Sequence, residues 1–144
     1  MKAINTSIII NSSPDQIWQT LMNFKDFSNW NPFIVSIEGK AKEGTHLKTQ
    51  IILGKKKPQT FKPNVLKVKT NEEFRWKGKL WLKGLFDGEH YFILEKIKEG
   101  KTKFIHGENF SGIFSKPIMN MIKDDTLEGF EKMNQALKIK VESK

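Results

Sequence analysis

Three polar residues late in the chain, His90, His106 and Glu108, are of the types that carry out acid–base chemistry. An imidazole or a carboxyl enclosed by apolar side chains has a shifted pKa and can exchange protons with a bound molecule. In TKFIHGENF, alternation places His106 and Glu108 on one face with Phe104 and Phe110. If this stretch pairs with GEHYFILEKI as a hairpin around Glu99–Gly100, we expect all three polar side chains on its concave face.

Two interpretations of these three residues stay open. In the first, they are the acid–base groups of an enzyme. In the second, Glu108 pairs with a nearby lysine, or lies near a rim with His106 as an orienting hydrogen-bond donor, because ion pairs also shift pKa values. Ligand pockets are mostly apolar with a few placed polar groups, and that alone would account for these residues.

Other familiar chemistry has no support in the sequence. There is no Cys, which excludes disulfides, thiolate metal sites and a cysteine nucleophile. The three histidines form neither an HExxH motif nor a helical i, i+4 pair, so we expect no metal site. The motifs GxSxG and the Walker phosphate loop are absent, and GLFDG is interpreted as a turn, so we expect no cofactor.

Length and composition predict a single domain over residues 1–144, with 38% apolar and 11% aromatic residues. The apolar run near the N-terminus is shorter than the roughly 7–15 residues of a secretion signal. No apolar run approaches the roughly 20 residues of a transmembrane segment. We therefore expect a soluble, cytoplasmic protein, and nothing in the sequence indicates an oligomeric state.

The formal net charge of +9 raises the question of a nucleic-acid partner. Of the 25 basic residues, only Arg75 is an arginine, the residue whose planar fork suits contacts with bases and phosphates. The lysines are dispersed along the chain, which is typical of a solvated surface. We therefore expect no specific nucleic-acid partner, although weak binding to anionic surfaces stays open.

The predicted elements must position these groups. A strand over residues 3–10 precedes two short helices over 14–23 and 25–30, and alternating stretches then predict an antiparallel meander. From Lys116 to about Val141, apolar residues recur at helical spacing. So long an amphipathic helix needs a partner of similar length, and the concave face of the sheet is the candidate. Gaps between a straight helix and a curved sheet predict an internal cavity.

Three stretches carry a resemblance to a known family. SSPDQIWQTLMNFKDFSNWNPFIVSIEGKAKEGTHLK, LFDGEHYFILEKIKEGKTKFIHGENFSGIF and EGFEKMNQALK resemble, in this order, the entry, the closing strands and the terminal helix of the SRPBCC superfamily. This superfamily comprises START-like, birch-pollen-allergen-like and polyketide cyclase-like proteins, and the resemblance spans essentially the whole chain. It implies an α+β helix-grip fold. In that fold, a curved antiparallel sheet of six or seven strands wraps around the long C-terminal helix, and two short helices follow the first strand.

The resemblance implies several functions. One is binding or transport of a small hydrophobic or amphipathic molecule, a lipid or a polyketide-like compound, in the cavity. Alternatives are a cyclase or aromatase that uses the same cavity, with His90, His106 and Glu108 as catalytic candidates, and a module that binds a chaperone. The superfamily shares no catalytic residues. The residues expected to line the cavity, with Phe33 of the aromatic NWNPFI stretch at one mouth, are Trp18, Phe33, Trp76, Trp81, His90, Phe92, Phe104, His106, Phe110, Ile118, Ile122 and Phe130.

Overall fold

The computed structural model describes residues 2–79 and 86–144. In chain order the elements are β1 (Lys2–Ile10), α1 (Pro14–Met22), the 3-10 turn η1 (Phe24–Asp26), α2 (Phe27–Trp30), β2 (Ile34–Glu38), β3 (Lys48–Ile51), β4 (Gln59–Phe61), β5 (Asn64–Lys69), β6 (Glu73–Lys79), β7 (Asp87–Lys98), β8 (Lys101–Ser111) and α3 (Ser115–Glu142). In the described part of the chain, no helix is both long enough and apolar enough to span a membrane.

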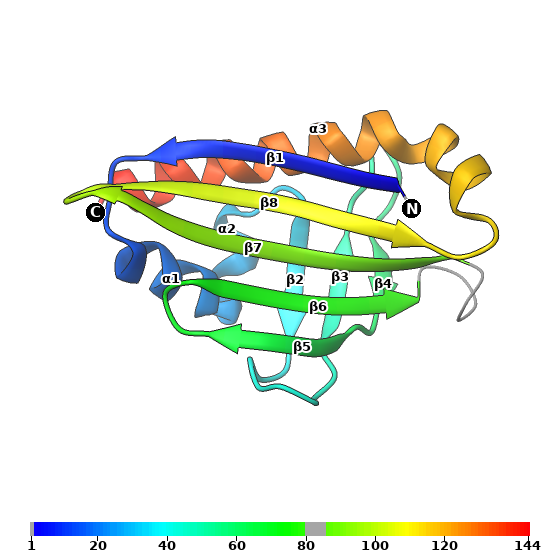
Figure 1. Cartoon of the computed structure of the whole chain (residues 1–144), viewed down its shortest axis with the longest axis horizontal. Coiled ribbons are helices and arrows are strands. Elements are labelled where there is room, and N and C mark those ends of the chain that lie inside the picture. Colours follow the sequence, from blue (N-terminus) through cyan, green and yellow to red (C-terminus); the bar gives the residue numbers. More distant parts are fainter. Residues whose placement is uncertain (1, 80–85) are drawn as a thin grey trace.

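The strands form two antiparallel sheets that face each other across the core. The larger sheet has the order β1-β8-β7-β6-β5, and the smaller has the order β2-β3-β4. Figure 1 shows the smaller sheet behind the larger one, with α3 running along the β1 side. The residues just before β3 join the sheets, because Leu47 N donates to Pro63 O and Val65 N donates to Thr45 O.

The predicted α+β architecture is confirmed, and the strand count differs for a local reason. The stretch QTFKPNVLKVK forms two strands, β4 and β5, that meet at Pro63 and belong to different sheets. Proline lacks the N–H that a ladder requires, so the chain turns there. The described residues accordingly form eight strands where six or seven were predicted.

Helix α3 has 28 residues and buries one face against the sheets. Its Gly129 faces the ring of Phe33: a Cβ at this position would lie 2.5 Å from Phe33 Cδ1. Glycine therefore lets the aromatic ring approach the helix backbone. The last turns of α3 are tied to the N-terminal elements, since Glu142 accepts from Asn11 N at 2.8 Å and Lys140 pairs with Asp26 at 3.2 Å.

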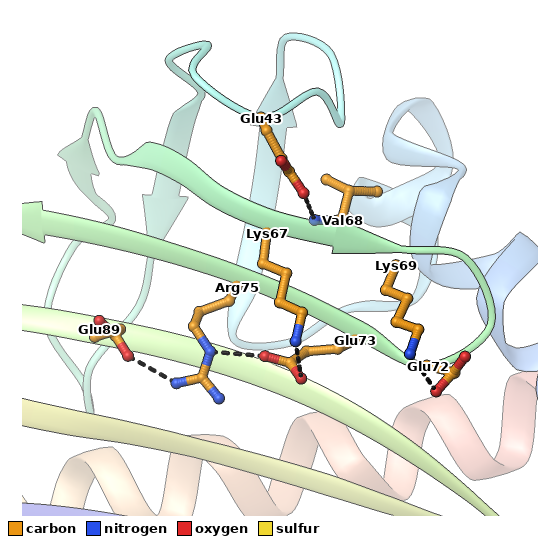
Figure 2. Close-up of polar contacts among 8 residues, drawn as sticks. All are labelled: Glu43, Lys67, Val68, Lys69, Glu72, Glu73, Arg75 and Glu89. Carbon is orange, nitrogen blue, oxygen red and sulfur yellow. Dashed lines mark hydrogen bonds and ion pairs between the residues drawn. The ribbon is translucent and has the colours of Figure 1, made fainter.

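The outer face of the larger sheet carries a network of ion pairs, shown in Figure 2. Arg75 donates to Glu73 at 2.8 Å and to Glu89 at 2.7 Å, and Lys67 lies 3.2 Å from Glu73. The Arg75 guanidinium also lies over the ring of Tyr91, 4.6 Å from its centroid. Because strand residues alternate between faces, fixing Arg75 outside directs its neighbours Phe74 and Trp76 inward, where both are buried.

Candidate functional site

A cluster of contacting rings fills the space between the larger sheet and α3. His106 of β8 stacks on Phe130 of α3 with ring centroids 4.0 Å apart, and His90 of β7 stacks on Trp76 of β6 at 5.0 Å. No ring of this central aromatic cluster is more than 4% exposed. Its members are Phe33, Trp76, His90, Phe92, Phe104, His106 and Phe130.

Phe33, the residue of the NWNPFI stretch that was expected at a cavity mouth, lies inside this cluster. Its ring centroid is 5.4 Å from that of Phe130 and 6.1 Å from that of His106, and only 3% of the residue is exposed. Trp30 packs edge-on against Phe27 at 5.3 Å, outside the cluster. Around Phe33, therefore, the protein's own side chains occupy the interior.

A buried polar network passes through the cluster. His90 Nε2 and His106 Nε2 are 2.8 Å apart, and His106 Nδ1 lies 2.9 Å from Asn134 Oδ1. Asn134 Nδ2 donates to Thr6 Oγ1 at 2.8 Å. At the other end, His90 Nδ1 lies 3.4 Å from Glu108 Oε1. Side chains from β1, β7, β8 and α3 thus form one continuous line.

Burial shifts the pKa values of all three titratable members toward their neutral forms. It lowers the pKa of His90 to about 3 and raises the pKa of Glu108 to about 8. Burial also lowers the pKa of His106 well below its ordinary value, and the neighbouring His90 acts in the same direction. Among the described residues, no Lys or Arg nitrogen lies within 4.0 Å of the Glu108 carboxyl. Burial therefore favours the neutral acid form of Glu108, and no cation of the described residues opposes it.

A pocket opens beyond the cluster, between α3 and the smaller sheet. We call it the mouth pocket; it has a volume of about 240 Å³. Phe86, in its wall, stacks on Phe110 of β8 with centroids 5.6 Å apart. Glu108 is two residues before Phe110 and on the same buried face of β8. The lining residues are Leu53, Lys56, Gln59, Phe61, Phe86, Ile118 and Ile122.

A larger depression lies on the outside of the sheet and suits an apolar molecule less well. It has a volume of about 440 Å³, and its walls include the exposed lysines Lys62, Lys77 and Lys79. The described residues of the mouth pocket form mainly apolar walls and include one lysine, Lys56. We therefore take the mouth pocket and the polar network behind it as the candidate site.

The residues predicted to line a cavity do not lie together in one place. Seven form the central aromatic cluster, whereas Ile118 and Ile122 line the mouth pocket. Phe110 stands between the two regions, and Trp18 is buried in the core with α1. Trp81 lies outside the described residues.

Sequence reasoning missed Asn134 and Thr6, although each left a signal. Asn134 is four residues after Phe130 and three before Leu137, so a polar residue occupies the apolar stripe of α3. Thr6 alternates with Ile4 and Ile8 on β1, which is also an inward position. Polar residues at such positions are expected to find buried partners.

The site has no features of a metal centre in the described part of the chain. Residues 2–79 and 86–144 bring together no group of three or more His, Cys, Asp or Glu side chains suited to hold an ion. The two buried histidines contact each other and Asn134. Three of their four ring nitrogens are therefore engaged in hydrogen bonds.

Comparison with known proteins places this geometry in a family. The family described as "Polyketide cyclase / dehydrase and lipid transport" matches residues 1–142. A sequence search found no match among curated proteins.

Solved structures agree in fold at low sequence identity. The Zhui aromatase/cyclase from Streptomyces sp. R1128 is 8% identical, with a TM-score of 0.78 over 98% of this chain and 93% of that one. Ara h 8.0201 is 15% identical, with a TM-score of 0.75 over 99% of each chain. Norcoclaurine synthase from Thalictrum flavum, solved with dopamine and hydroxybenzaldehyde, is 16% identical, with a TM-score of 0.73 over 99% of this chain and 87% of that one. These similarities confirm the helix-grip fold expected from the sequence.

Proposed function

The chain belongs to the polyketide cyclase/dehydrase and lipid transport family, and on that premise we propose that it binds a small hydrophobic or amphipathic molecule in the mouth pocket. The observation that carries the proposal is the pocket of about 240 Å³ between Phe61, Phe86 and Ile122, with Lys56 among its lining residues. Apolar walls with a few polar groups are characteristic of ligand sites.

The size of the pocket limits the ligand. Ligand sites commonly measure roughly 300–1,000 Å³, so the mouth pocket is small for its class. The central aromatic cluster blocks deeper entry, because its rings contact one another and are almost fully buried. We therefore favour a ligand with one or two rings or a short chain, with any acidic group near Lys56.

Native mass spectrometry of freshly purified protein, followed by organic extraction, tests whether such a molecule accompanies it. A variant with Ile122→Trp fills the pocket, and Ile139→Trp places the same ring on an exposed position of α3 as a control. We expect titration with 1-indanone, a small bicyclic ketone, to show binding to the wild type and to Ile139→Trp, and at least tenfold weaker binding to Ile122→Trp. Equal binding by all three proteins would contradict the assignment of the pocket.

A second candidate function is an acid–base reaction, a cyclisation or dehydration at the inner end of the same site. It is favoured by the contact of 3.4 Å between Glu108 and His90, together with the His90–His106 contact of 2.8 Å. A carboxyl whose pKa is near 8 can act as a general acid at neutral pH. Incubation with a synthetic poly-β-ketone thioester tests this function: turnover should be lost in Glu108→Gln, and product formation equal to that without protein would exclude it.

A further inference from the structure

The buried polar network has two chemically different ends. Asn134 and Thr6 line a groove of about 380 Å³ between β1 and α3, together with Glu131 and Gln135. Glu108 lies at the other end, and 11% of its side chain is exposed, against 2% for His90. The protonation state of Glu108 depends on which atoms of the network carry hydrogens.

The groove end fixes the direction of the hydrogen bonds. With its Oδ1 toward His106, Asn134 accepts from His106 Nδ1 and donates from Nδ2 to Thr6 Oγ1, which in turn donates to His106 O at 2.8 Å. If the amide were reversed, Thr6 would have to donate to Asn134, and its bond to the His106 carbonyl would be lost. The observed orientation makes one more buried hydrogen bond and is therefore preferred.

This direction determines both histidine tautomers. Since His106 Nδ1 donates to Asn134, the Nε2 of a neutral His106 is an acceptor. The His90 Nε2 at 2.8 Å must then donate, which leaves His90 Nδ1 as an acceptor facing Glu108. An acceptor facing a carboxyl requires the carboxyl to carry the hydrogen.

The alternative, an ion pair of protonated His90 with ionised Glu108, fits the geometry less well. Charge-assisted hydrogen bonds are short, about 2.7–2.9 Å, whereas His90 Nδ1 and Glu108 Oε1 are 3.4 Å apart. Among the described residues, the titratable side chain that contacts this pair is His106 of β8, through His90. Burial keeps His106 neutral, so it would not stabilise a carboxylate.

We propose that Asn134, held by Thr6, is a positioning residue that fixes the tautomers of His106 and His90 and thereby keeps Glu108 in its acid form. That hydrogen is directed at His90, so the Glu108 carboxyl belongs to the network. The proposal concerns the ligand-free protein and does not rest on the proposed binding function.

Two-dimensional ¹H–¹⁵N correlation spectra of the imidazoles test the tautomers in the ligand-free protein. At pH 6.5 we expect hydrogen on Nδ1 of His106 and on Nε2 of His90. Hydrogen on Nε2 of His106, or a doubly protonated His90, would overturn the proposal.

Variants assign the effect to Asn134. Asn134→Leu removes the acceptor at nearly constant volume, and His106 should then show a mixture of tautomers. Thr6→Val leaves Asn134 in place but makes its two orientations equivalent, so a mixture is expected here too, even if Asn134→Leu fails to fold. Gln135→Leu, an exposed neighbour in the same groove, should keep the wild-type tautomers. Unchanged tautomers in Thr6→Val would refute the role of Asn134.

Discussion

The acid form of Glu108 should make the stability of the protein depend on pH in a specific way. Glu108→Gln replaces the acid with a neutral group of the same shape that can still donate to His90. Folding raises the Glu108 pKa from 4.5 to about 8. Between these values the folded protein holds one proton that the unfolded chain has lost. Wild-type stability therefore falls with rising pH because of this group, by about 1.4 kcal/mol per pH unit.

His90 and His106 make the free energy of unfolding depend on pH in the opposite direction, over a lower range of pH. Their pKa values lie below the ordinary value of 6.5 in the folded protein, so the unfolded chain binds more protons below pH 6.5. The two together outweigh Glu108 between pH 4.5 and 6.5. The wild type should therefore be most stable near pH 6.5 and should lose about 2 kcal/mol as the pH rises to about 8.

Urea unfolding at several values between pH 5 and 8.5 measures the effect. The free energy of unfolding of Glu108→Gln, minus that of the wild type, should rise by about 3 kcal/mol over about two pH units and level off above about pH 8, where folded Glu108 also ionises. Subtracting the two curves removes the contributions of all other groups. Glu131→Gln, which removes one exposed carboxylate of α3, controls for the change in net charge. Parallel curves for Glu108→Gln and the wild type would refute the idea that Glu108 is held as an acid.

Two further predictions concern packing and the outer face. Alanine is a better helix former than glycine, but at position 129 its Cβ would meet the enclosed Phe33 ring. Gly129→Ala should therefore lower the free energy of unfolding, measured with urea, by about 1–3 kcal/mol. A gain in stability would contradict the close approach of the ring to the helix. Arg75→Lys should lose the bridge between Glu73 and Glu89 and cost about 0.5–1 kcal/mol at low salt, with the difference shrinking in 1 M NaCl. An effect independent of salt would assign the role of Arg75 to its packing on Tyr91 instead.

The sequence allowed the architecture to be predicted because its patterns are local. Alternation in TKFIHGENF correctly placed His106 and Glu108 on the buried face of β8, and helical spacing located α3 to within a residue or two. The division at Pro63 was missed: alternation predicted one meander, whereas the residues that flank the proline belong to different sheets.

The details of the site depend on contacts that no local pattern contains. Phe33 and Gly129 are far apart in the chain, and only their meeting shows that the aromatic ring fills the interior. The partners of His106 come from β1 and from α3, near opposite ends of the sequence. Residue types could suggest that an imidazole and a carboxyl meet, but the direction of their hydrogen bonds required the positions of Asn134 and Thr6.

The pairing of β1 with β8 has a consequence for how the chain folds. Lys2 is opposite Phe110 and Ile10 is opposite Thr102, so the first strand is completed only by residues about a hundred positions later. The neighbouring hairpins from β5 to β8 join strands that are close in sequence and can form early. During synthesis β1 therefore stays unpaired until the ribosome has released β8. Such long-range closure is slow, and we expect the joining of β1, β8 and α3 to be the late step in folding.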